Sequence, residues 1–178
     1  MLSTIIINEH YFLEEVSLSH LTDITMHLNN PMIERNMLRL PSPYLFSDAS
    51  TFYNICKKLN QEHSKIMHYH ILNSKNEAIG GIGLQGKYGI DNVADEIGYW
   101  IAESYWNKGI MSQVLHVFTE FLNTKHHLNR IEAVVFNGNE ASSKILLKNG
   151  FINEGLIEGG LLKKDQKIEA YIFSKLYI

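Results

Sequence analysis

The sequence Asp95-Glu96-Ile97-Gly98-Tyr99-Trp100-Ile101-Ala102 is followed, after three residues, by Trp106-Asn107-Lys108-Gly109-Ile110-Met111-Ser112. This stretch predicts a strand that carries the acidic Glu96 and leads through a short turn into a helix. The first N–H groups of a helix have no partners within it, and the helix dipole places partial positive charge there. Phosphate oxygens satisfy both features. The stretch therefore predicts a site for a phosphate-bearing cofactor beside a candidate base.

Gly109 is expected in the first turn of this helix, which the pattern begins at Lys108. A glycine inside a helix costs up to about 1 kcal/mol relative to alanine, so it usually has a reason such as close backbone approach. The alternative is a loose helix start without function. A nucleotide-triphosphate loop is disfavoured, because Lys108 precedes Gly109 and no second glycine stands at the required spacing.

Three polar residues are candidates for chemistry. Glu96 stands in an otherwise apolar strand, where a carboxylate must face water, find a partner or act as a base. The alternative is a half-exposed acid on an edge strand, paired with a lysine. Asn139 and Ser142 share one helix face at i and i+3. Asn139 could equally be an N-cap, and Ser142 could bond back to the preceding turn.

Two other motifs are not assigned a function. Gly81-Ile82-Gly83-Leu84-Gln85-Gly86 has the spacing of a dinucleotide fingerprint, but no helical pattern follows it. These glycines are expected in and after a strand that packs close to its neighbour. His68 and His70 share a strand face, but no third metal ligand accompanies them, so no metal site is expected.

Length and composition restrict the class of protein. The 178 residues suit one domain over 1–178, and the net charge of −3 argues against a nucleic-acid binder. The lone Cys56 excludes an internal disulfide, is expected to be a buried structural thiol, and fits a reducing compartment. No segment has the apolar length of a membrane span, so a cytoplasmic protein without a membrane partner is expected.

Periodicity and turn residues predict an order of elements that implies a mixed α/β sheet flanked by helices. The strongest prediction is the helix over 108–125, where Val114, Val117, Phe118 and Phe121 recur at helical spacing. Gly150 is expected to end the later helix over 139–149, in the left-handed conformation. The predicted elements are strand 11–16, helix 19–29, a helix from Ser47-Asp48 to about 61, hairpin strands 65–72 and 77–84, strand 93–102, helix 108–125, buried strand 130–136, helix 139–149, and hairpin strands 151–162 and 167–176.

Several motifs in this order resemble the GNAT acetyltransferase superfamily. Within it they are most similar to the RimJ/RimL type, which acetylates the N-termini of ribosomal proteins. The similarity is strongest from Glu77 to Tyr177. The motifs that carry it are Ile79-Gly80-Gly81-Ile82-Gly83-Leu84, Glu96-Ile97-Gly98-Tyr99-Trp100-Ile101, Tyr105-Trp106-Asn107-Lys108-Gly109-Ile110-Met111, Arg130-Ile131-Glu132-Ala133, and the run from Asn139 to Phe151 with Glu154-Gly155 after it.

The resemblance implies a GNAT fold with a single mixed, mostly antiparallel sheet. It also implies direct transfer of acetyl from acetyl-CoA to a primary amine, either a protein N-terminus or a small molecule. Glu96 would be the base, often acting through water, and Ser142 would protonate the leaving CoA thiolate. The implied cofactor-binding residues are Tyr99, Trp100, Ile101 and Ala102 along the pantetheine arm, Asn107, Lys108, Gly109, Ile110, Met111 and Ser112 at the pyrophosphate, and Asn139 and Ser142 near the thiol.

Some positions depart from the family pattern. Trp106 stands where the family has Gln or Arg, Met111 replaces a usual Gly or Ala, and Leu146 occupies the position of a tyrosine acid. The segments 31–45 and 85–92 are expected to shape the acceptor pocket. A homodimer is compatible with the family. The alternative function is a non-catalytic acyl-CoA-binding module or sensor on the same fold.

Overall fold

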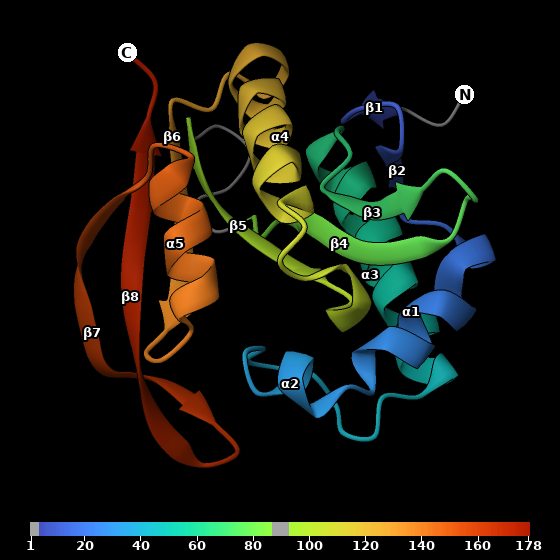
Figure 1. The fold of residues 1–178 in the computed structure, drawn as a ribbon, viewed down its shortest axis with the longest axis horizontal. Coiled ribbons are helices and arrows are strands. Elements are labelled where there is room, and N and C mark those ends of the chain that lie inside the picture. Colours follow the sequence, from blue (N-terminus) through green and yellow to red (C-terminus); the bar gives the residue numbers. More distant parts are fainter. Residues whose placement is uncertain (1–3, 87–92) are drawn as a thin grey trace. The chain divides into compact units, whose positions relative to one another are not determined.

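The computed structural model describes residues 4–86 and 93–178, which form two compact units. Unit 1 comprises Met1–Leu84 and Tyr99–Lys108, and unit 2 comprises Gln85–Gly98 and Gly109–Ile178. The strands, labelled in Figure 1, are β1 (Ile5–Ile6), β2 (Tyr11–Glu15), β3 (His68–Asn73), β4 (Ala78–Leu84), β5 (Ala94–Ile101), β6 (Arg130–Phe136), β7 (Ile152–Lys163) and β8 (Gln166–Leu176). The helices are α1 (Leu21–Leu28), α2 (Pro31–Glu34), α3 (Phe46–His63), α4 (Ile110–His126) and α5 (Glu140–Lys148), and Leu18–His20 and Glu103–Tyr105 form 3₁₀ turns.

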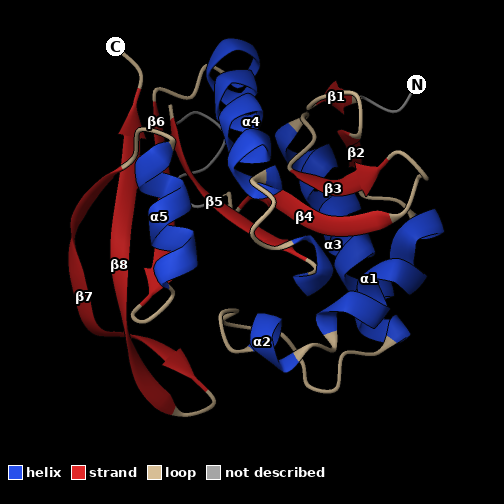
Figure 2. Cartoon of the chain, viewed as in Figure 1, coloured by secondary structure: helices blue, strands red, loops and turns tan. Residues whose placement is uncertain are grey.

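The strands form one sheet in the order β1-β2-β3-β4-β5-β6-β8-β7. β5 and β6 run parallel, whereas the pairs β1–β2, β2–β3, β3–β4, β6–β8 and β7–β8 run antiparallel. Figure 2 shows the strands in red and the helices in blue. The expected α/β fold with a mixed, mostly antiparallel sheet is confirmed. The first part of β5 belongs to unit 2 and its last residues, from Tyr99, to unit 1.

Unit 1 is built around helix α1 and the β3–β4 hairpin. The buried face of α1 carries Leu21, Ile24 and Leu28, which belong to one cluster with Leu72 and Ala78. This confirms the helical periodicity of the sequence. The helix proper begins at Leu21 rather than at Ser19, because the preceding residues form a tighter 3₁₀ turn. Both tryptophans, Trp100 and Trp106, pack against the same cluster.

Unit 2 is built around helices α4 and α5, which lie side by side, and the strands β6, β8 and β7. The buried face of α4 carries Met111, Val114, Leu115, Phe118 and Leu122. This face is shifted from the predicted one, because Val117 and Phe121 are only half-buried and Leu115 and Leu122 take their place. β6 lies between β5 and β8 and is largely buried, as its apolar sequence predicts.

The glycines of the β4 region sit where a side chain would not fit. A Cβ on Gly80 would lie 2.5 Å from the carbonyl oxygen of Trp100, and one on Gly81 would lie 2.9 Å from the Trp100 indole nitrogen. This confirms that the glycine motif packs close to a neighbouring strand. Its continuation at 87–92, predicted as a turn, lies outside the described residues.

Two further details concern the ends of elements. Gly150 has a φ of 81° and ends α5 as predicted. β1 was not predicted, because two residues are too short to carry a periodic signal.

Among the described residues, no helix combines the length and apolar character that a membrane crossing requires.

Candidate functional site

The turn before α4 has the geometry of a helix start with open amides. Asn107 and Gly109 both lie in the left-handed region, with φ values of 58° and 72°, and flank Lys108. Gly109 is the N-cap and has no side chain that could bond to the first amides. The backbone bond from Gln113 N to Gly109 O is 3.2 Å, so the N–H groups of residues 110–112 precede the helical ladder.

Gly109 therefore lies before the helix, not in its first turn as predicted. A Cβ at this position would meet no atom within 4 Å, so the glycine is not required by close packing. It is required by its positive φ, which other residues adopt only with strain. The space around the turn is thus open on the side where a Cβ would project.

The first residues of α4 anchor this turn in unit 2. Ile110 and Met111 are buried, and Met111 is only 5% exposed, so its thioether is part of the core. The hydroxyl of Ser112 accepts a hydrogen bond of 3.1 Å from Asn149 Nδ2, at the end of α5. Asn149 also donates to the carbonyl of Ile145 at 2.8 Å. Sequence reasoning missed Asn149, because its contact to Ser112 joins residues 37 positions apart.

Glu96 lies in the first part of β5. Its register partner is Glu132 on the parallel strand β6, and its carbonyl oxygen accepts from Gln85 N at 2.8 Å. β5 has neighbours on both sides, so the alternative of an acid on an edge strand is wrong. The register of β5 with β6 runs from Ala94 to Glu96, and no later pair between them occurs in the described residues.

The neighbouring acid, Asp95, is the more deeply buried of the two, with 4% exposure. Its carboxylate accepts from Gly86 N at 3.2 Å and from Glu96 N at 2.7 Å. Sequence reasoning missed this role. The signal was the alternation of the strand, which places Asp95 on the same face as the buried Ile97.

An ionised network crosses the sheet next to Glu96 in unit 2. Arg130 donates to Glu132 at 2.8 Å through Nε, and to Glu154 at 2.9 and 2.5 Å through its two terminal nitrogens. Ser174 donates to Glu154 at 2.5 Å. The hydrogen bonds from Arg130, and then that from Ser174, hold the pKa of Glu154 below its ordinary value. Glu132 is buried despite its charge.

Asn139 and Ser142 meet at the start of α5. The Asn139 side-chain oxygen accepts from Ser142 N at 3.3 Å, which confirms the N-cap interpretation of Asn139. The hydroxyl of Ser143 donates to the Asn139 carbonyl at 3.4 Å. The cap uses Oδ1 of Asn139, and its Nδ2 hydrogens are chemically distinct donors.

The residues predicted along the pantetheine arm lie in unit 1. Ile101 and Ala102 are buried, and Ala102 N donates to the carbonyl of Ile79 at 2.8 Å. Trp106, the departure from the family pattern, donates from its indole nitrogen to the carbonyl of Ile101 at 2.8 Å. The tryptophan therefore closes the turn that follows β5.

The predicted site residues are distributed over both units. Glu96, the run Gly109–Ser112, Asn139 and Ser142 belong to unit 2, whereas Tyr99–Ala102 and Asn107–Lys108 belong to unit 1. Within the described ranges, no group of three or more His, Cys, Asp or Glu side chains could hold a metal ion. Of the segment 85–92, expected to shape the acceptor pocket, residues 87–92 lie outside the described part.

Unit 1 holds two histidines and a cysteine whose pKa values are shifted by burial: His70 and Cys56 are buried, and His68 is half-buried. His70 stacks edge-on against His20 with ring centroids 5.6 Å apart. Burial lowers the pKa of His68 to about 4 and that of His70 to about 3, the latter also through His20. Burial raises the pKa of Cys56 to about 12. This confirms Cys56 as a buried thiol, and a protonated thiol is a poor nucleophile.

Comparison with known proteins identifies the family. The model of the acetyltransferase (GNAT) domain matches residues 11–152. The uncharacterized N-acetyltransferase YoaA of Bacillus subtilis is 35% identical over 79 residues, which are 44% of this chain and 45% of that protein. The alignment thus spans about half the length of this curated relative.

Solved structures share the fold. RimL, a ribosomal L7/L12 alpha-N-protein acetyltransferase, superposes with a TM-score of 0.85 at 21% identity, over 99% of this chain and 96% of its own. The microcin C7 self-immunity acetyltransferase MccE, solved with acetyl-CoA and AMP, gives a TM-score of 0.82 at 19% identity, over 96% and 94%. These structures confirm the expected fold. Because the domain match covers most of the chain, the protein belongs to the GNAT acetyltransferase family.

Proposed function

We propose that this protein transfers an acetyl group from acetyl-CoA directly to a primary amine. The observation that carries the proposal is the open start of α4, where the first amides follow a glycine that cannot cap them. Membership of the GNAT family supports an acetyl-CoA-dependent acyltransferase as the enzyme class.

The residues around this turn fit a diphosphate. The N–H groups of Ile110, Met111 and Ser112 point out of the helix start, where the dipole favours negative charge. Lys108, which is exposed, adds a cation next to them. Burial of Met111 removes its side chain from the open turn. The donor set is therefore one of neutral amides and one cation, which suits phosphate oxygens.

Other residues would orient the rest of the cofactor. The main chain of Tyr99–Ala102 would hydrogen-bond the amide groups of the pantetheine arm, as an added strand does. Asn139 would donate from Nδ2 to a pantetheine carbonyl, because its Oδ1 already caps α5. When bound, acetyl-CoA supplies the activated thioester, and the protein aligns it with the amine.

Binding at the turn is tested by placing a charge in it. Ser112→Asp adds a carboxylate within the first turn of α4, and Ser112→Asn is the neutral control of similar size. We expect Ser112→Asp to weaken CoA binding at least tenfold, because like charges repel, while the melting temperature stays the same or rises since an acid suits a helix start. Isothermal titration with CoA measures the first effect. Equal affinities of the two variants would contradict a diphosphate at this turn.

We assign proton transfer to two residues. Glu96 would accept a proton from the amine, directly or through water, and Ser142 would donate one to the leaving thiolate. The amine must be neutral to attack. Deprotonating a peptide α-amine at pH 7 costs only ~1 kcal/mol, whereas a lysine costs ~4.6 kcal/mol. A weak base such as a half-buried glutamate is therefore sufficient for an N-terminus.

The role of Glu96 is tested by its amide analogue. Glu96→Gln should lower kcat most at low pH, where more of the amine is protonated and a base is needed most. The measurement is the pH dependence of kcat with a saturating peptide amine. A pH profile identical to that of the unmodified protein would remove Glu96 from the mechanism.

For the acceptor we propose the α-amine of a protein N-terminus. RimL, a ribosomal L7/L12 alpha-N-protein acetyltransferase, shares the fold over nearly the whole chain. The test is an acetylation assay with N-terminal peptides, polyamines, aminoglycosides and amino acids, followed by mass spectrometry. Transfer to small amines alone would overturn this choice of acceptor. Binding of acetyl-CoA without turnover of any amine would instead favour a non-catalytic acyl-CoA sensor.

A further inference from the structure

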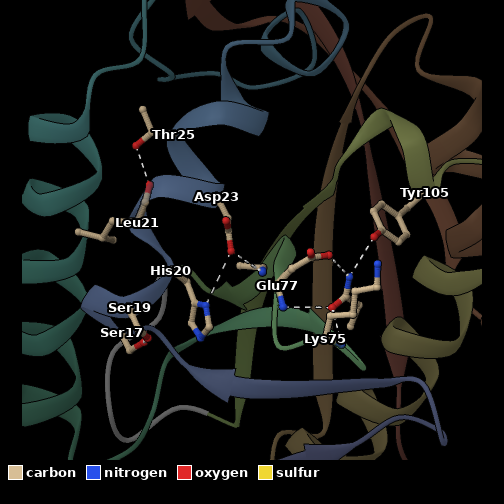
Figure 3. A network of polar contacts seen from close by, with 11 residues as sticks. Ser17, Ser19, His20, Leu21, Asp23, Thr25, Lys75, Glu77 and Tyr105 are labelled. Carbon is tan, nitrogen blue, oxygen red and sulfur yellow. Dashed lines mark hydrogen bonds and ion pairs between the residues drawn. The ribbon is translucent and has the colours of Figure 1, made fainter.

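A chain of side-chain contacts in unit 1 runs from the β3–β4 turn to Lys108, the residue before Gly109. Asn73, at the end of β3, bonds to Tyr105 in the 3₁₀ turn, and the Tyr105 ring contacts Lys108. Figure 3 shows Tyr105 with its hydroxyl directed at the polar group around Lys75 and Glu77. None of the three was singled out for this connection by the sequence, because Asn73 and Tyr105 are 32 positions apart.

Asn73 has a side chain whose position is fully determined by hydrogen bonds. It is only 7% exposed. Its Oδ1 accepts from Lys75 N at 2.9 Å and from Glu77 N at 3.0 Å, and its Nδ2 donates to Glu77 Oε2 at 2.7 Å. The same Nδ2 donates to the Tyr105 hydroxyl at 3.0 Å. The amide therefore shapes the hairpin turn and reaches across to Tyr105 at the same time.

The turn is also braced from helix α1. Asp23 Oδ2 accepts from Ala78 N at 3.0 Å and lies 3.9 Å from His20 Nδ1. These contacts, also drawn in Figure 3, tie Ala78, which follows Glu77, to helix α1. The β3–β4 turn is thus fixed by side chains on two sides, which makes it a rigid support for Tyr105.

Tyr105 in turn holds Lys108. The ammonium nitrogen of Lys108 lies 5.3 Å from the centroid of the Tyr105 ring, within the range of a cation–π contact. Lys108 stands between the two left-handed residues Asn107 and Gly109. A turn with two such residues needs support from its surroundings to keep its shape. The Tyr105 ring provides a fixed surface at the middle of this turn.

We propose that Asn73 is a positioning residue for the turn over 107–109, called here the cofactor turn because the diphosphate is proposed to bind beside it. Acting through the Tyr105 hydroxyl, it fixes the ring that orients Lys108 and the left-handed backbone before α4. The arrangement needed for the diphosphate is therefore present before the cofactor binds, which increases affinity. This inference rests on the proposed acetyl-CoA function and adds a remote determinant of its affinity.

The first test removes only the hydroxyl. Tyr105→Phe keeps the ring under Lys108 but loses the bond from Asn73. We expect the Kd for CoA and the KM for acetyl-CoA to rise about three- to tenfold, with kcat and the KM for the amine unchanged. Tyr53→Phe is the matched control, because it removes another half-buried tyrosine hydroxyl of unit 1. A purely structural role would move kcat and both KM values together.

A double-mutant cycle tests the route. Asn73→Ala should raise the Kd for CoA at least as much as Tyr105→Phe, and adding it to Tyr105→Phe should have a clearly smaller effect. Thermal melts check that each variant is folded. If Tyr105→Phe binds CoA as the unmodified protein does, or if the two effects multiply independently, the inference is overturned while the proposed function stands. If the unmodified protein does not bind CoA, the proposed function is itself overturned.

Discussion

The two compact units differ in the polar groups that burial and pairing hold. Unit 1 holds neutral groups: the buried amide of Asn73, and the imidazoles of the buried His70 and the half-buried His68, whose pKa values are lowered. Unit 2 holds the buried Glu132, which is paired with Arg130, and Arg130 also binds the exposed Glu154. A neutral buried group is stable only while it stays uncharged, whereas a buried ion needs its counter-ion.

This difference suits the two tasks that we propose. In the proposed function, unit 2 would contribute the helix start and the Glu96 carboxylate, both of which would act through charge. Unit 1 contributes a rigid frame of hydrogen-bonded turns behind Lys108.

Acid should destabilise unit 1 before unit 2. The pKa values of His68 and His70 are lowered from 6.5 in the folded state, so the unfolded chain takes up protons first as the pH falls below 6.5. Their contribution is complete above pH 6.5 and is lost progressively as the pH falls, toward pH 4 for His68 and toward pH 3 for His70. The loss should be on the order of 2 to 3 kcal/mol by pH 5.5.

The carboxylates of unit 2 respond later. The pKa of Glu154 is lowered by Arg130, and that of Glu120 by the Tyr177 hydroxyl, so their contributions are lost only as the pH falls below the ordinary 4.5. Both tryptophans report on unit 1. Their fluorescence should therefore change at a higher pH than the amide-exchange protection of β6 and β8. Coincident transitions would show that the difference between the units does not govern acid unfolding.

Removing one ion from unit 2 should have the next largest effect. Arg130→Met takes the Nε donor from the buried Glu132, and we expect the free energy of unfolding to fall by about 2 kcal/mol. The companion variant Arg130→Met with Glu132→Gln should recover part of this loss, because it removes the buried charge. Urea unfolding at pH 7 measures both. A double variant as unstable as the single one would contradict the ionised interpretation.

The smallest effect separates two roles of Asn139. Asn139→Ala removes the cap of α5 and should lower the free energy of unfolding by about 1 kcal/mol, whereas Asn139→Asp keeps an accepting oxygen and should not. Both lose the Nδ2 donor, so both should bind CoA more weakly if that donor contacts the pantetheine. Thermal melts and titration distinguish the two effects. Unchanged CoA affinity in Asn139→Asp would leave Asn139 as a cap alone.

Local patterns were sufficient for most of the elements. The strand Arg130–Phe136 was predicted with the bounds it has, because an unbroken apolar run between turns has few other solutions. The buried face of α4 was predicted less well, since periodicity alone does not say whether Val117 or Leu115 faces the core. The start of α4 was predicted two residues too early, and this changed the role of Gly109 from helix interior to left-handed N-cap.

By itself, the sequence determined the α/β order of elements, the family, and the residues expected at the cofactor turn, because all of these depend on contiguous motifs. The tertiary structure alone decided which side chains support that turn. Asn149 bonds to Ser112, and Asn73 to the Tyr105 that holds Lys108, across 37 and 32 positions of the chain. Such contacts leave no periodic trace, since a hydrogen bond depends on where the folded backbone brings two atoms together and not on their spacing in the sequence.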